Sequence, residues 1–150
     1  MTALAARTAL AALALAGCAQ LEPDVGRLTV GTCKDAATTS QTVSFASDIR
    51  PLISRGMGGC GCHLPTGAGQ GPATQLIGLD LGSYASLREG GVNSGTQVIV
   101  AGSPCSSILY QKVDDAPPFG NRMPLGGPPF LTDDELALVH DWIAEGGADN

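Results

Sequence analysis

Two cysteines and a histidine lie within four consecutive residues near the middle of the chain, in the order Cys60-Gly61-Cys62-His63. The sequence C-x-x-C-H is an attachment signature for c-type haem, but here a single residue separates the cysteines. Thiolates and imidazole also bind zinc, and two thiols can be oxidised to a disulfide. The pattern alone is therefore compatible with a haem attachment site, a metal site or one half of a disulfide.

Residues 1–17 predict a signal peptide. One positive charge, Arg7, precedes an apolar run from about Ala9 to Ala16, which is too short for a membrane-spanning helix. The stretch Leu15-Ala16-Gly17-Cys18 resembles the lipobox of bacterial lipoproteins, which implies cleavage before Cys18 and a lipid on Cys18. We therefore expect an exported protein whose lipid anchors it to a bilayer of the bacterial cell envelope. The periplasmic face is expected, at the outer membrane rather than the inner one, or else the cell surface.

The chain is acidic, with eight Lys and Arg residues against 14 Asp and Glu residues. Removal of residues 1–17, which contain one Arg and no acid, changes the formal net charge from −6 to −7. Because phosphate binding needs a basic surface, nucleic acid is not an expected partner. An acidic surface can instead steer a basic protein partner.

Four cysteines remain after Cys18, namely Cys33, Cys60, Cys62 and Cys105. Exported cysteines lie in an oxidising compartment, so we expect them to be disulfide-bonded or covalently occupied. Cys60, Cys62, His63 and Cys105 have the chemistry of a Cys3His zinc site. The oxidising compartment and the single-residue spacing both argue against zinc.

Only short elements are predicted before the last helix. Residues 18–43 are polar and turn-rich and predict a lipid-anchored linker ahead of a domain over 44–147. Apolar residues at helical spacing predict a first helix from Phe45 that ends near Arg55. We expect further short helices at 83–89 and 105–113, short extended runs at 79–81 and 96–100, and a long proline- and glycine-rich loop at 116–130.

The clearest element is a terminal amphipathic helix. Thr132 forms a capping box with Glu135, and Gly146 and Gly147 end the helix. His140 lies beside the apolar stripe, so we expect it at the surface or half-buried and not as a ligand. The stripe consists of Leu136, Val139 and Ile143, with Trp142 beside it.

The core is poor in large apolar side chains. The chain has 21 Gly and 10 Pro but only three Phe, two Tyr and one Trp. A loop-rich domain of this size needs something else to fold around, and a haem would supply a large apolar disc.

Several segments together resemble the small class I-type cytochrome c domains of exported proteins from proteobacteria and planctomycetes. The resemblance covers about residues 44–147. It implies a mainly α fold of the small cytochrome c type, in which a few short helices, long loops and at most one short two-stranded β element pack around one covalent haem c. The matching segments are SFASDIRPLI (44–53), Cys62-His63, GLDLGSYASLREGG (78–91), AGSPCSSILYQKV (101–113) and PPFGNRMPLGGPPFLTDDELALVHDWIAEGG (117–147).

The resemblance makes His63 the proximal iron ligand and Met123 the distal one. The chain has only two histidines, and a His/Met pair is a recognised ligation of c-type haem that raises the reduction potential. Met57 is too close to His63 in sequence to reach the opposite face of a haem easily. Arg122 is suited to pair with a haem propionate. Trp142 is expected to pack the terminal helix against the first helix and the haem.

The family has two residues between its cysteines, and the missing residue puts the role of Cys60 in question. Side chains at i and i+2 point to opposite sides of an extended chain and lie about 200° apart around a helix. Two such thiols cannot easily reach two vinyl groups on one edge of a haem. Cys62, next to His63, is the expected attachment site. Cys60 forms either a second thioether or a disulfide with Cys105 or Cys33.

These expectations describe an electron carrier rather than an enzyme. With His63 and Met123 in both axial positions no site is left for a small-molecule substrate. We expect single-electron transfer between redox partner proteins in transient complexes, including service as a subunit of a partner oxidoreductase. The alternative is a haem-free surface lipoprotein, stabilised by disulfides or by the Cys3His zinc site, that acts as a binding or structural module.

Overall fold

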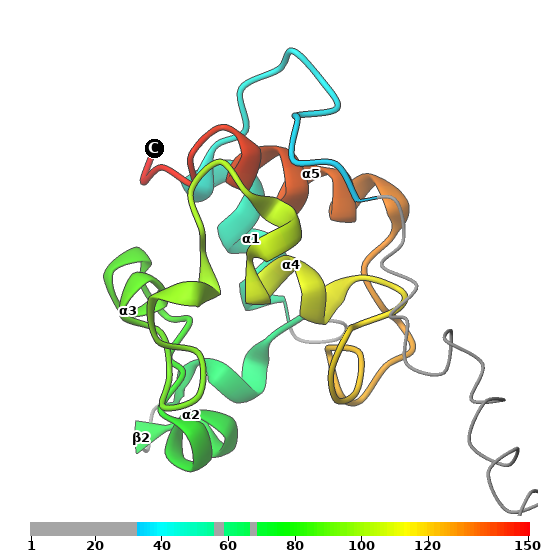
Figure 1. Cartoon of the computed structure of the whole chain (residues 1–150). Helices are drawn as coiled ribbons and strands as arrows, with labels where there is room; N and C mark the ends of the chain where they lie inside the picture. The colour runs from blue at the N-terminus through cyan, green and yellow to red at the C-terminus, as the bar shows by residue number, and fades with distance from the viewer. Residues whose placement is uncertain (1–32, 56–58, 67–68) are drawn as a thin grey trace, which may run out of the picture.

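Short helices joined by long loops form most of the chain (Figure 1). The computed structural model describes residues 33–55, 59–66 and 69–150. The predicted signal peptide, Cys18 and Met57 lie outside these residues. The α-helices of the described part are α1 (Arg50–Ser54), α2 (Pro72–Ile77), α3 (Tyr84–Glu89), α4 (Ile108–Val113) and α5 (Asp133–Ala144).

Shorter turns supplement these helices. A π-helical turn, η1 (Phe45–Ile49), leads directly into α1, and three 3-10 turns are η2 (Gly61–His63), η3 (Gly95–Val98) and η4 (Pro104–Ser106). The strands β1 (Pro65–Thr66) and β2 (Gly69–Gln70) form one antiparallel pair, with Pro65 opposite Gln70. The prediction of a small, mainly α fold is confirmed, whereas packing around a haem stays a prediction.

Helix α5 has the predicted boundaries because its capping groups bond as expected. The Thr132 N–H donates to Glu135 Oε2 at 2.8 Å, and the Glu135 N–H donates to Thr132 Oγ1 at 3.3 Å. Gly146 and Gly147 have φ values of 110° and 61° after the helix, a backbone region that glycine adopts without steric cost. The Gly147 N–H donates to the Trp142 carbonyl at 2.8 Å and closes the end of α5.

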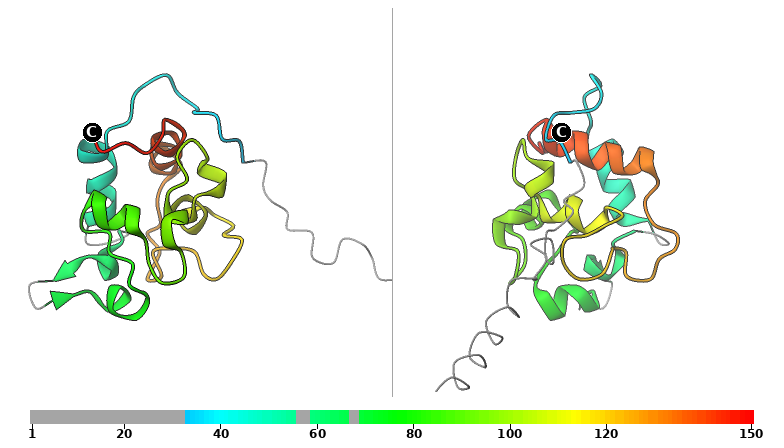
Figure 2. Two further views of the ribbon diagram at one scale, coloured as in Figure 1. Left: turned by 60° about the vertical axis from the view of Figure 1, so that its left-hand side comes forward. Right: turned by 45° about the vertical axis from the view of Figure 1, so that its right-hand side comes forward.

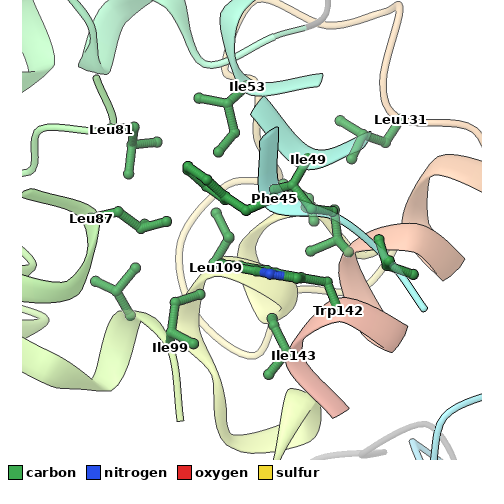
Figure 3. Packing of buried hydrophobic residues seen from close by; sticks show 14 of the residues in the cluster. Phe45, Ile49, Ile53, Leu81, Leu87, Ile99, Leu109, Leu131, Trp142 and Ile143 are labelled. Atoms are coloured by element: carbon green, nitrogen blue, oxygen red, sulfur yellow. The ribbon is translucent and has the colours of Figure 1, made fainter. Parts of the chain in front are cut away.

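The core gathers around Trp142, which is 1% exposed (Figure 3). Its ring lies 5.4 Å from the Phe45 ring, and the Phe45 ring lies 5.3 Å from that of Tyr84. The Trp142 Nε1 donates to the Ala148 carbonyl at 2.9 Å, so the buried polar group is satisfied. Since Phe45 belongs to η1, Trp142 packs α5 against the first helical segment, as predicted.

Three elements between the first helix and α4 differ from the predictions. The runs at 79–81 and 96–100 are not strands, because 95–98 form η3 and 79–81 have no strand partner among the described residues. Helix α2 was not predicted, although Pro72 at its first position and Gly78 after its end, with φ 68°, are common helix boundary residues. The helix predicted at 105–113 is present as α4, in which Leu109 is buried and Ile108 is half-buried.

The segment 33–43, assigned above to the linker, is held against α5 (Figure 1). The Asp141 carboxylate accepts the backbone N–H of Thr38 at 2.7 Å and that of Thr39 at 2.9 Å, as well as both hydroxyls. Val43 is 3% exposed, and its N–H donates to Glu145 Oε2 at 2.9 Å. These eleven residues are therefore part of the folded unit. We call the segment 33–43 the strap.

His140 is buried, which corrects the prediction of a surface or half-buried side chain. It is 6% exposed, and its Nε2 donates to the Lys34 carbonyl at 2.7 Å while its Nδ1 donates to Asp141 Oδ1 at 2.9 Å. Both ring nitrogens therefore have a hydrogen-bond partner, one on the strap and one on α5. The helical phase of α5 could not reveal this, because the strap covers a face that the helix alone would leave exposed.

Candidate functional site

The C-x-C-H sequence folds as a tight turn anchored to α1. The Cys60 N–H donates to the Ile53 carbonyl at 2.9 Å. The His63 N–H then donates to the Cys60 carbonyl at 2.8 Å, and the Leu64 N–H donates to the Gly61 carbonyl at 3.2 Å. The backbone of η2 is thus fixed at both ends.

The ring of His63 is oriented by a backbone carbonyl. His63 Nδ1 lies 3.2 Å from the Leu79 carbonyl oxygen, and because that oxygen only accepts, Nδ1 is the donor. The Leu81 N–H donates to the His63 carbonyl at 2.8 Å and ties the two segments together. A neutral imidazole that donates from Nδ1 presents the lone pair of Nε2, and this arrangement is common for histidines that bind metals.

Two glycines permit the close packing around this turn. A Cβ at Gly71 would lie 2.5 Å from the Cys62 carbonyl oxygen and 2.7 Å from that of Leu64. A Cβ at Gly82 would lie 2.5 Å from Cδ of Pro65. The loops before α2 and α3 therefore approach the C-x-C-H turn more closely than any side-chain-bearing residue would allow.

The cysteine pairing removes two of the alternatives left open by the sequence. Cys33 and Cys105 form a disulfide with a Cα–Cα distance of 5.8 Å, while Cys60 and Cys62 are free thiols. The prediction of a disulfide between Cys60 and Cys105 or Cys33 is therefore wrong. The Cys3His zinc site is also wrong, because Cys105 is not available, and no group of three or more His, Cys, Asp or Glu side chains in the described residues could hold a metal ion.

The two free thiols lie in different surroundings. Cys62 is exposed, whereas Cys60 is half-buried and packs against the hydrophobic core. Burial raises the pKa of the Cys60 thiol to about 11, an effect that the nearby Arg55 partly opposes and Cys62 adds to. Cys60 is therefore a neutral thiol at physiological pH.

Met123 packs against the same hydrophobic core as Cys60. Its N–H donates to the Lys112 carbonyl at 2.7 Å, which holds the loop 116–130 against α4. In Figures 1 and 2 this loop and the segment 59–66 both lie toward the end of the molecule opposite α5 and the C-terminus. The loop that contains Met123 and the segment of the C-x-C-H turn thus lie in the same half of the molecule. Among the described residues no hydrogen bond joins Met123 to His63, since Met123 bonds Lys112 and His63 bonds Leu79.

Arg122 interacts with its own loop. Its Nε donates to the Val113 carbonyl at 3.0 Å, its guanidinium forms an ion pair with Asp115, and its Cζ lies 4.4 Å from the centre of the Phe130 ring. These contacts fix the loop on both sides of Met123. Pairing of Arg122 with a propionate stays a prediction.

Two clefts lie along the strap, away from the C-x-C-H turn. The larger, of about 580 Å³, is lined by Cys33, Lys34, Ala36, Ala37, Thr38, Tyr110, Asp114, Asp115, Asp133, Leu136, Ala137 and His140. The smaller, of about 350 Å³, lies between the strap and the end of the chain and includes Trp142 and Asn150 in its lining. Neither cleft is lined by Cys60, Cys62, His63 or Met123.

No protein-family model, no curated protein and no solved structure matches the chain. Within the part of the chain that the structure describes, none of the helices has the length and apolar character needed to cross a bilayer. The sequence could not predict that the Leu79 carbonyl orients His63, because any residue has a backbone carbonyl and no residue type indicates this contact.

Proposed function

We propose that the protein is an exported, lipid-anchored monohaem cytochrome c that transfers single electrons between redox partner proteins. The observation that carries this proposal is the orientation of His63 by the Leu79 carbonyl, which lies 3.2 Å from Nδ1. The residue that precedes His63 in the sequence is Cys62, an exposed free thiol. A ligand histidine needs this second bond to keep its ring in place and its Nε2 unprotonated. When bound, the haem supplies a reversible one-electron couple.

The donor set of the described residues fits a c-type haem. Cys62 offers an exposed sulfur for attachment, His63 offers Nε2, and Met123 offers a thioether sulfur from a loop that is bonded to α4. A nitrogen and a thioether ligand together favour the reduced iron. Because both ligands come from the protein, we assign the chain to electron transfer and not to catalysis.

The acidic surface supports a basic redox partner. The net charge of the mature chain is −7 by the count given above, and the exposed side chains of Asp133 and Asp134 lie together at the start of α5. Opposite charge on a partner speeds transient docking, and this effect weakens as salt is added.

The competing function is a haem-free surface lipoprotein, and the Cys33–Cys105 disulfide is the observation in its favour. This bond joins residues 72 apart in sequence and stabilises a loop-rich domain without any cofactor. In that case Cys60 and Cys62 would be thiols or would pair with each other.

The two functions are separated by haem staining of the full chain after denaturing electrophoresis. The chain is expressed in a bacterium with a working cytochrome c maturation system, and the proposal predicts colour that stays with the band. The Cys60→Ser/Cys62→Ser double variant should lose the colour, whereas the matched Cys33→Ser/Cys105→Ser variant should keep it. An uncoloured wild-type band in that strain refutes the proposal.

A further inference from the structure

We propose that the larger cleft along the strap is a docking site for an arginine side chain on a basic segment of a partner protein. The guanidinium pairs with the carboxylates of Asp114 and Asp133, and the carbon stem packs on Tyr110. We call this hollow the strap cleft. The inference goes beyond the proposed function, because neither a haem nor the residues proposed to hold it take part.

The strap cleft is built from three parts of the fold. One wall is the strap, which contributes Cys33, Lys34 and residues 36–38, and the rest of the lining comes from the end of α4 and the first half of α5. In Figure 1 the strap runs beside α5. The volume of the cleft, about 580 Å³, lies within the range of about 300–1,000 Å³ that is typical of ligand sites.

Covalent and hydrogen bonds hold the strap wall in place. The Cys33–Cys105 disulfide joins the first residue of this wall to η4. At the other end of the wall, the backbone N–H of Thr38 donates to the buried Asp141 carboxylate at 2.7 Å. A cleft that exists before its ligand arrives avoids the cost of ordering the chain on binding.

The charged groups of the lining favour a cation. The lining includes three aspartates and one lysine, Lys34. Asp115 already forms an ion pair with Arg122, so Asp114 and Asp133 are the carboxylates that can pair with a ligand. Asp133 is exposed and Asp114 is half-buried, so a side chain that enters from solvent can reach both.

The cleft also has apolar surface within the field of its carboxylates. Tyr110, Leu136 and Ala137 contribute this surface to the lining. Burial raises the pKa of the Tyr110 hydroxyl, and the carboxylates of Asp114 and Asp115 raise that pKa further. A negative potential therefore reaches the aromatic part of the cleft.

An apolar surface beside carboxylates suits arginine better than other cations. A metal ion is a poor match, because no group of three or more His, Cys, Asp or Glu side chains in the described residues could hold one. The guanidinium of arginine is planar, pairs with carboxylates and stacks on aromatic rings, whereas the ammonium of lysine is compact and strongly hydrated. The carbon stem of arginine covers apolar surface while its charge remains near water.

The charge of the chain favours a different protein over a second copy as the partner. The mature chain has a net charge of −7 by the count given above, so two copies repel each other at an acidic cleft, whereas a basic protein is attracted. Cys60, Cys62, His63 and Met123 do not line the cleft. The docked arginine therefore contacts none of the proposed haem-binding residues.

The test is an NMR titration of the isotope-labelled full chain with the peptide acetyl-Gly-Leu-Arg-Leu-Gly-amide. The control peptide has citrulline, a neutral isostere, in place of arginine. The proposal predicts that the arginine peptide shifts the amide signals of Ala37, Thr38 and Ala137 and that added salt weakens this binding. The citrulline peptide should leave these signals in place.

Two variants with the same change of net charge separate the cleft from the general acidity of the chain. Asp114→Asn/Asp133→Asn should raise the Kd of the arginine peptide by about fivefold, the effect of losing two ion pairs at a partly exposed site. Unchanged signals away from the cleft show that this variant is folded. The control Glu89→Gln/Asp149→Asn removes two exposed acids outside the lining and should change the Kd by less than about twofold.

Four outcomes would overturn the inference. Three of them are the absence of any shift up to millimolar peptide, equal shifts with the citrulline peptide, and an equal loss of affinity in both double variants. The fourth is broadening of the same signals with chain concentration alone, which would assign the cleft to a second copy. The haem stain described above is independent of these results, since an uncoloured chain that binds the peptide at the cleft refutes only the proposed function.

Discussion

Replacing Asp141 by asparagine should destabilise the fold by about 2–4 kcal/mol at pH 7. The carboxylate is 1% exposed and accepts hydrogen bonds from Thr38, Thr39 and His140. Asparagine offers one acceptor oxygen in place of two, and its amino group would face N–H donors. The substitution also replaces the carboxylate oxygen that bonds the buried His140 ring at 2.9 Å by a group of a neutral amide.

The pKa of Asp141 provides a second measure of the same interaction. Burial alone would raise it, but the bonds from Thr38, His140 and Thr39 outweigh burial and lower the pKa from 3.8 to about 2. A depression of this size corresponds to about 2.5 kcal/mol of stabilisation. Because the folded-state pKa is the lower one, this stabilisation is present above pH 3.8 and is lost as the pH falls to about 2. The difference between wild type and Asp141→Asn should therefore shrink over that range.

Urea unfolding followed by fluorescence is the suitable assay, since the single tryptophan is Trp142 in the core. Unfolding free energies are measured from pH 7 to pH 2 for wild type, Asp141→Asn and the control Asp149→Asn. Asp149 is exposed, so its substitution should change stability by less than about 0.5 kcal/mol. A similarly small effect of Asp141→Asn at pH 7, or an effect independent of pH, would refute the reasoning.

Three further predictions concern the disulfide, the packing of the C-x-C-H turn and the distal ligand. The Cys33→Ser/Cys105→Ser variant should lose about 4 kcal/mol of stability in urea unfolding, because the bond closes a loop of 72 residues; a loss below about 1 kcal/mol would contradict this mechanism. Gly71→Ala should cost roughly 2 kcal/mol and reduce the haem content, since its Cβ would lie 2.5 Å from the Cys62 carbonyl oxygen. Gly126→Ala, where a Cβ meets nothing within 4 Å, is the control, and equal effects of the two variants would argue against the steric explanation. Met123→Leu keeps an apolar side chain but removes the sulfur, so the reduction potential measured by redox titration should fall, and an unchanged potential would remove Met123 from the ligand set.

The parts of the fold that sequence predicted are those determined by neighbouring residues. The capping box of Thr132 and Glu135 and the glycines after α5 act within single turns, and the first helix follows from apolar spacing within ten residues. The boundary signals of α2 were also local, but its glycines and prolines are equally common in loops. The runs at 79–81 and 96–100 had a strand-like alternation without a partner strand, and alternation alone does not form a ladder.

The residue types of the candidate site could be read from the sequence, but their pairing and surroundings could not. Cysteine spacing does not determine disulfide connectivity. Cys33 can pair with Cys105 because the folded chain holds the strap beside η4. The winding of η2 as a 3-10 turn likewise depends on anchors outside it, at Ile53 before and Leu79 and Leu81 after.

By itself the sequence determined the C-x-C-H motif, the predicted signal peptide and lipobox, the acidic charge and the capped terminal helix, because each depends on residue identity within a few positions. Only the tertiary structure decided that Cys33 pairs with Cys105, that the strap buries His140 and Asp141, and that the Leu79 carbonyl orients His63. These features join residues from 16 to 106 positions apart. Such contacts form only when the whole chain packs, and no local pattern encodes them.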